Sequence, residues 1–292
     1  VNLDSVPKDF LSKATSATDI KYLFAGCTSL KDLPVGMFTN NSSVTNLEYI
    51  FYRTGVEKLS AGLFEGLSAV KTIGAVFQDC VALSEIEEGV FDGLTSAKAV
   101  KNCFSGCTSL REIPEGLFRG LTAAYEFKST FEDSALESIP EALFADARNY
   151  SSADFSYMLA GCRNLKTVPA GLFETFTAVT SPGFKYAFSE SAIETLPSGL
   201  FAKNTAVTQG FENTFNGCDC LTTIESGVFP ESSSVSTLAY TFEGCTALES
   251  LPEGLFDPLA ASKTKFTATF KNCTALKTLP AGLFAQNSLA AQ

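Results

Sequence analysis

The chain has 292 residues, of which 45% are hydrophobic, and it carries a formal net charge of −11. It contains no histidine, which excludes Ser-His-Asp and Cys-His catalysis and any histidine-ligated metal site. The acidic balance, without a run rich in Lys or Arg, argues against a nucleic acid partner. No segment has the ~20 predominantly apolar residues of a membrane span.

A repeat of about 27 residues runs through nearly the whole chain. Phenylalanine, replaced once by leucine, opens each unit at intervals of 26 to 29 residues. The ten opening positions are Phe24, Phe51, Phe77, Phe104, Phe131, Leu159, Phe188, Phe215, Phe242 and Phe270. A second phenylalanine follows 13 or 14 residues later in all ten units. A fixed period in this range predicts a solenoid whose stacked coils bury these phenylalanines.

The N-terminal segment is expected to form an incomplete unit. Leu3, Val6, Pro7 and Phe10 match the second half of a repeat. We therefore predict a partial repeat over residues 1–23, continuous with a repeat solenoid over 24–292 in one domain. Neither end shows the polar outer face of a capping repeat, so the chain is interpreted as a segment of a longer protein.

The stretch before and across each opening residue has helical spacing. Val44, Leu47, Phe51 and Thr54 stand at steps of three, four and three, which is one face of an α-helix. Two residues after the opening position comes Gly in five units, and Asp79, Asp133 or Asn272 in three others. These residues tolerate the left-handed backbone that ends a helix. The pattern predicts a short helix in each coil.

A short strand is expected in the other half of each coil. The motif Leu-x-x-Leu/Ile recurs, as at Leu110 and Ile113, and proline follows it in seven of ten units. Proline lacks the N–H donor that would extend a ladder of hydrogen bonds. The predicted fold is therefore α/β: a right-handed solenoid of about ten coils, each with a short parallel strand and a short helix.

Seven of the nine cysteines fall in one column of the repeat. They are Cys27, Cys80, Cys107, Cys162, Cys218, Cys245 and Cys273. In the three remaining units Thr54, Ser134 and Ser191 take this place. We interpret the column as small buried side chains whose S–H or O–H satisfies backbone groups. Parallel side chains on stacked coils would strain a disulfide, and the spacing lacks the pairs typical of zinc sites.

Two residues before each opening position lies a column that varies while its neighbours do not. It holds tyrosine in five units. The tyrosines are Tyr22, Tyr49, Tyr157, Tyr186 and Tyr240. Tyrosine is a favoured contact residue in interfaces, so these five are the candidate ligand-binding residues. A tyrosine that simply packs over the next coil is the alternative interpretation.

An acidic surface is expected near the strands of three consecutive units. It comprises Glu85, Glu87, Glu88, Glu112, Glu115, Glu137 and Glu141. Stacked carboxylates can bind Ca²⁺, but no Asp-rich loop with ligand spacing is present. A solvated acidic face is therefore predicted, with no metal and no cofactor.

The run from Cys107 through Leu110, Ile113 and Gly116 to Phe118 resembles leucine-rich repeats, most of all the BspA-like type. Val44–Phe51 is similar to the 26-residue repeat of bacterial surface proteins. The resemblance covers about residues 3 to 284. It implies an exported cell-surface protein that binds host proteins, matrix or other cells. The strand of a standard unit is shortened here by proline, which departs from a broad concave sheet.

Three classes of function follow from these observations. The leading hypothesis is a non-enzymatic binding or adhesion scaffold at a bacterial surface, with a protein or matrix ligand. The alternative is a glycan-binding surface protein, with the tyrosine column stacking on sugar rings. An enzyme is the third class, for which no nucleophile–base pair can be named. The expected partner is a host or cell-surface protein or glycan, without nucleic acid and without a membrane-spanning segment.

Overall fold

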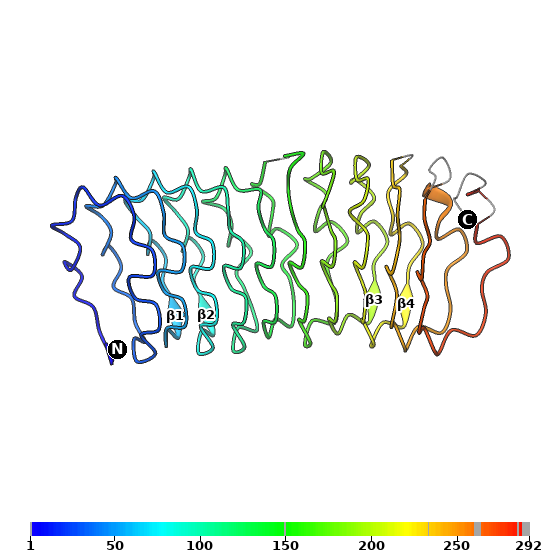
Figure 1. Ribbon diagram of the computed structural model, residues 1–292, viewed down its shortest axis with the longest axis horizontal. Coiled ribbons are helices and arrows are strands. Elements are labelled where there is room, and N and C mark those ends of the chain that lie inside the picture. The colour runs from blue at the N-terminus through cyan, green and yellow to red at the C-terminus, as the bar shows by residue number, and fades with distance from the viewer. Residues whose placement is uncertain (1, 149, 233, 260–263, 285, 288–292) are drawn as a thin grey trace. The chain divides into compact units, whose positions relative to one another are not determined.

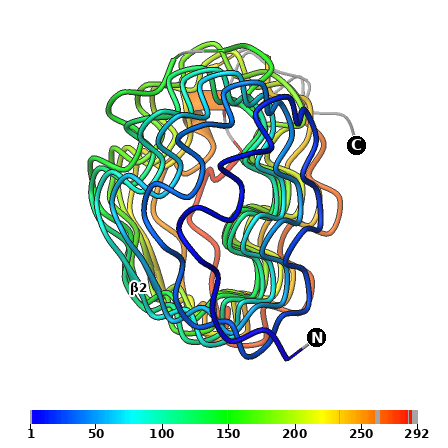
Figure 2. The same cartoon turned by 90° about the vertical axis from the view of Figure 1, so that its left-hand side faces the viewer.

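In the computed structural model, residues 2–148, 150–232, 234–259, 264–284 and 286–287 are described. They form two compact units, residues 1–136 with 142–148 and residues 137–141 with 149–292. Within each unit, successive coils of the chain lie side by side (Figure 1). Seen from the end, the coils of a unit follow nearly the same path (Figure 2).

The regular elements of the described chain are short. Strand β1 (Lys58–Leu59) pairs in parallel with β2 (Glu85–Ile86) in the first unit. In the second unit β3 (Thr195–Leu196) pairs in parallel with β4 (Thr223–Ile224). A 3₁₀ turn, η1, spans Asp257–Leu259. Figure 1 labels β1 and β2 on one pair of neighbouring coils and β3 and β4 on another pair.

All four strands lie on the predicted Leu-x-x-Leu/Ile motif or its variants, and their pairing is parallel. The expectation of one strand in every coil is not confirmed, because the other described coils have no strand at this motif. In each pair, the backbone N–H just after the second strand closes the ladder. Glu87 N donates to Leu59 O (2.9 Å), and Glu225 N donates to Leu196 O (3.0 Å). Proline takes this position in seven units and has no such donor. The proline therefore limits pairing along this side of the coils.

The predicted helices are wrong: the described residues contain no α-helix. Val44, Leu47, Phe51 and Thr54 are buried as the spacing requires, but they lie on consecutive turns. Ile50 N donates to Leu47 O and Thr54 N to Phe51 O, three residues back. Alternate N–H groups instead bond to the next coil, as Phe51 N does to Val76 O (3.1 Å).

The phenylalanine columns form the core, as predicted. Most of their side chains are fully buried, and rings of adjacent coils stack. Phe51 lies between Phe24 and Phe77, with ring centroids 5.6 Å away on each side. Phe64 contacts Phe38 at 6.0 Å and Phe91 at 5.9 Å in the second column. Each coil therefore depends on its neighbours for burial of its largest side chains.

Six of the seven residues of the cysteine column are buried and Cys273 is half-buried. Thiols of the column donate to backbone carbonyls, which confirms the interpretation of their role. Cys80 Sγ donates to Phe51 O (3.1 Å) and Cys218 Sγ to Phe188 O (3.1 Å), both in the preceding coil. In two units that lack the cysteine, the hydroxyl donates to a carbonyl of its own coil instead: Thr54 Oγ1 donates to Phe51 O (2.9 Å), and Ser191 Oγ donates to Phe188 O (2.7 Å).

We expect these thiols to react slowly with a bulky thiol reagent in the native protein. Cys220 is exposed and Cys273 is half-buried, while the other seven are buried. Burial also raises the pKa of the Cys103 and Cys107 thiols, which suppresses the reactive thiolate. A titration should find Cys220 fast, Cys273 slow, and close to nine thiols after denaturation. Recovery of several disulfides by mass spectrometry would contradict this prediction.

Candidate functional site

The variable column that contains the tyrosines has an unusual backbone. All ten of its residues adopt the left-handed conformation, with φ between 52° and 59°. We call it the left-handed column. Its members are Tyr22, Tyr49, Ala75, Asn102, Ser129, Tyr157, Tyr186, Asn213, Tyr240 and Ala268. A non-glycine residue in this region costs roughly 1–2 kcal/mol relative to a right-handed conformation.

Hydrogen bonds between and within coils hold this conformation. Tyr49 N donates to Gly74 O in the next coil (3.1 Å), and Tyr52 N returns to Tyr49 O (3.1 Å). In the second unit Tyr157 N donates to Lys185 O (3.1 Å), and Ala160 N returns to Tyr157 O (3.1 Å). The left-handed residue thus ends one turn while its N–H joins the neighbouring coil.

The repeat places tyrosines of adjacent coils face to face. The rings of Tyr22 and Tyr49 stack with centroids 4.7 Å apart and planes 6° apart. Tyr157 and Tyr186 stack at 4.6 Å and 8°. Tyr22 is 52% exposed, and the other four tyrosines of the column are half-buried. The rings of both pairs therefore lie side by side on adjacent coils, and their role in binding stays a prediction.

Charged groups flank the second tyrosine pair. The Lys185 ammonium lies 5.8 Å from the centre of the Tyr186 ring, within cation–π range. Lys185 Nζ also donates to Glu212 Oε2 at 2.9 Å. This hydrogen bond raises the pKa of Lys185, so the lysine remains charged beside the ring at neutral pH.

Around the first pair, the structure adds two residues that sequence analysis missed. The Tyr52 ring meets Tyr49 edge-on at 5.7 Å, and the Arg53 guanidinium lies 4.9 Å from the Tyr52 ring centre. Arg53 Nε also pairs with Asp79 Oδ2 at 3.1 Å. The sequence contained a signal for Arg53, because five other units have glycine at the equivalent position. In the structure this residue has a left-handed backbone, with φ 54°.

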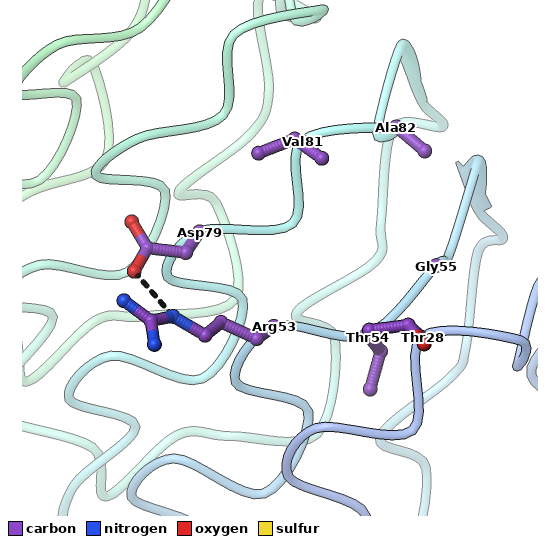
Figure 3. Close-up of a pocket in the computed structure, with 7 residues that line it drawn as sticks. All are labelled: Thr28, Arg53, Thr54, Gly55, Asp79, Val81 and Ala82. Carbon is purple, nitrogen blue, oxygen red and sulfur yellow. Dashed lines mark hydrogen bonds and ion pairs between the residues drawn. The ribbon is translucent and has the colours of Figure 1, made fainter. Parts of the chain in front are cut away.

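A shallow pocket of about 490 Å³ opens beside this group (Figure 3). Figure 3 shows the Arg53–Asp79 ion pair on one side and Val81 and Ala82 on another. Thr28, Thr54 and Gly55 complete the lining. Val81 is 57% exposed, so an apolar side chain lies next to a charged pair. Stacked tyrosines, a cation–π contact and this pocket make up a mixed aromatic and charged surface in the first unit.

The acidic face is partly neutralised by ion pairs between coils. Lys58 Nζ lies 2.6 Å from Glu85 Oε1 and 2.7 Å from Glu87 Oε1, and Arg119 pairs with Glu88. Hydrogen bonds to these carboxylates raise the pKa of Lys58 and lower the pKa of Glu87. Among the described residues, no group of three His, Cys, Asp or Glu side chains is placed to hold a metal ion.

In the part of the chain that the structure describes, no helical segment could span a lipid bilayer.

Comparison with known proteins gives the fold but no family. No protein-family model matches the chain, and no curated protein matches it either. A solved structure of the glycosylated Toll–Spatzle complex of Drosophila is similar, with a TM-score of 0.56 and 18% identity. The match covers 96% of this chain and 33% of the other, so this chain spans about a third of that protein.

Two further solved structures match with lower scores. One is the complex of Latrophilin 3, Unc5D and the leucine-rich-repeat protein FLRT2, with a TM-score of 0.46 and 14% identity over 86% of this chain and 65% of the other. Another is a leucine-rich cell surface protein of Faecalibacterium prausnitzii, with a TM-score of 0.28 and 18% identity over 94% and 80%. The match to the Toll–Spatzle structure, with its TM-score above 0.5, shows that the chain has a leucine-rich-repeat fold.

Proposed function

We propose that this chain is a non-enzymatic binding scaffold that recognises a protein ligand through the left-handed column and the groups beside it. The observation that carries the proposal is the absence of glycine from that column. Glycine adopts this backbone without strain, and the chain contains 21 glycines. Yet all ten positions retain a side chain.

A second left-handed column, four residues later in each unit, provides the comparison. It is Gly26, Arg53, Asp79, Gly106, Asp133, Gly161, Glu190, Gly217, Gly244 and Asn272. Glycine takes five of these ten places. The repeat therefore accepts glycine where only the backbone matters. Side chains kept at a strained position favour a role for those side chains, and strained residues cluster at functional sites.

The arrangement of the tyrosines suits a protein partner. Each stacked pair offers a rigid amphipathic surface, so little conformational entropy remains to be lost on binding. Tyrosine and arginine are enriched among the residues that dominate binding energy. Both residue types lie beside the first pocket, in the group formed by Tyr22, Tyr49, Tyr52 and Arg53. The similar chain of the Toll–Spatzle complex also belongs to an assembly of proteins.

A binding role also agrees with the state of the nucleophilic groups. The chain has no histidine, and the thiol pKa of Cys80 is raised to about 11 by burial. Carboxylates such as Glu85 and Asp79 are engaged in ion pairs. We further propose a BspA-like protein of a bacterial cell surface or the extracellular space, with adhesion as its role. In this proposal residues 1–23 continue into the repeats of 24–292.

The test is a double substitution in each stacked pair. Tyr22→Ala with Tyr49→Ala, or Tyr157→Ala with Tyr186→Ala, should leave circular dichroism unchanged, because the column accepts Ala75 and Ala268. Binding is measured on a panel of immobilised extracellular-matrix and epithelial surface proteins. In at least one of the two double variants, the affinity for a protein that binds the unmodified chain should fall by roughly tenfold or more. Tyr125→Ala, outside the column, is the matched control.

Two outcomes would count against the proposal. If both double variants unfold, the column is part of the core. If both fold and bind every partner of the unmodified chain with unchanged affinity, the ligand surface lies elsewhere, and the acidic face is the next surface to substitute.

A further inference from the structure

A second pocket, of about 530 Å³, lies in the second unit between the coils that carry Glu212, Ala239 and Thr267. These coils are yellow to orange in Figure 1. Tyr240 of the left-handed column forms one wall, and Gln209 and Lys265 also line the space. We call it the Tyr240 pocket. Its volume falls within the ~300–1,000 Å³ typical of small-molecule sites.

The pocket exists because one column of the repeat lacks a long side chain there. Three residues before each opening position, the sequence has Lys185, Glu212, Ala239 and Thr267 in successive units. The Glu212 carboxylate pairs with Lys185 on its other side, at 2.9 Å. Threonine is too short to reach across to Glu212. The space above Ala239 is therefore left open.

The first unit shows how such a gap is otherwise closed. Gly74 occupies the same column between Glu48 and Lys101. There the Lys101 side chain extends over the glycine, and its Nζ lies 3.8 Å from Glu48 Oε1. Gly74 and Ala239 are small residues at equivalent positions of the repeat. The space beside Gly74 is filled by a lysine side chain, whereas the space beside Ala239 is a pocket. The difference follows from threonine in place of lysine at 267.

Tyr240 differs from the other tyrosines of the column. Its column neighbours are Asn213 and Ala268, so it has no tyrosine in an adjacent coil to stack on. Tyr22, Tyr49, Tyr157 and Tyr186 each cover one ring face with a partner. Tyr240 is half-buried, and within the described chain no other aromatic ring contacts it. Its ring is therefore available to a ligand in the pocket.

The polar groups of the lining are of both hydrogen-bonding types. Gln209 has an amide donor and an acceptor, Lys265 a charged donor, and Thr267 a hydroxyl that does both. These three side chains have no hydrogen-bond partner or ion pair within the described ranges, whereas Glu212 keeps one oxygen on Lys185. One carboxylate and one ammonium line the pocket, so it favours no strongly charged ligand.

We propose that the Tyr240 pocket binds one neutral monosaccharide unit of a glycan. A pyranose presents hydroxyls that both donate and accept hydrogen bonds, which matches Gln209, Thr267 and Lys265. Its C–H face is apolar and slightly positive, and it packs on the negative face of an aromatic ring. This site is distinct from the two stacked tyrosine pairs on which the test of protein binding rests, because Tyr240 is the one tyrosine of the column without a stacked partner in the described chain.

Saturation-transfer NMR on the whole chain tests this directly. The probes are the methyl glycosides of glucose, galactose, mannose, fucose, N-acetylglucosamine and N-acetylgalactosamine, with glucuronic acid as the charged comparison. We expect at least one neutral glycoside to receive saturation through its ring C–H protons. Tyr240→Ala should weaken that binding by roughly tenfold, which is about 1.4 kcal/mol, and Tyr240→Phe should largely retain it.

Ala239→Lys supplies a second variant that closes the pocket without removing the ring. The column accepts lysine at Lys185 and Lys128, so this variant should fold and abolish glycoside binding. Tyr49→Ala, in the first unit, should leave binding unchanged. The proposal is overturned if no neutral glycoside binds, if only glucuronic acid binds, or if folded Ala239→Lys protein binds like the unmodified chain. Loss of protein binding in the tyrosine-pair variants with glycoside binding retained would separate the two sites.

Discussion

Replacing Phe127 with alanine should lower the free energy of unfolding by about 3–5 kcal/mol. The Phe127 side chain is 1% exposed. Its ring contacts Phe118 at 5.4 Å and meets Phe144 edge-on at 5.0 Å. Truncation removes these contacts and leaves a cavity that adjacent coils cannot fill, because their backbones are fixed by hydrogen bonds between coils. Urea unfolding followed by circular dichroism measures the loss.

Phe10→Ala is the matched comparison. Phe10 is 53% exposed and contacts the ring of Phe24 at 5.9 Å. With half of its surface already in water, its truncation should cost about 1 kcal/mol or less. Equal losses for the two variants would contradict a core in which each coil is stabilised by its neighbours.

Stability should fall steeply above about pH 9 because of the cysteine column. Burial raises the pKa of Cys80 from 9.0 to about 11 and that of Cys218 to about 12. Between these values the unfolded chain loses the thiol proton while the folded protein keeps it. The folded state then binds more protons, so unfolding becomes easier as pH rises. Each such thiol contributes a loss of about 1.4 kcal/mol per pH unit above pH 9.

At pH 10.5 the loss is about 2 kcal/mol for each of these two thiols. Cys218→Ser should flatten the slope, because the serine hydroxyl does not titrate in this range, and the repeat accepts serine at this position in the unit of Ser191. Cys220→Ser is the control, because Cys220 lies nearby but is exposed. Urea midpoints from pH 7 to 10.5 would show both effects. A pH profile identical for Cys218→Ser and the unmodified chain would refute the assignment.

The core and the thiol column could be predicted from sequence because, in each of them, one residue type recurs at the same position of successive repeats. Phe51 and Phe64 occupy columns with almost no exceptions, and burial of apolar side chains does not depend on the details of the backbone. Cys80 and its replacement Thr54 share only small size and a weak donor, which predicts a buried position beside a carbonyl. Tyr22 and Tyr49 stack because equal places in successive units lie in neighbouring coils.

Helices could not be distinguished from stacked turns by spacing alone. The steps of three and four from Val44 to Thr54 bring side chains to one side in both structures. The difference is the hydrogen-bond partner of Phe51 N, which is Val76 O in the next coil and not a carbonyl four residues back. Aromatic and β-branched residues in this stretch are weak helix formers, and this was the available signal.

The sequence by itself determined the period, the buried columns and the residues that share a column, because those depend on residue type and position. Tertiary structure decided which backbone the coils adopt and where their surface is open. The left-handed conformation of Tyr240 and the gap above Ala239 arise from contacts between residues about 27 positions apart. Such contacts depend on the lengths of several side chains at once, as with Lys101 and Thr267, and therefore appear only when the coils are stacked.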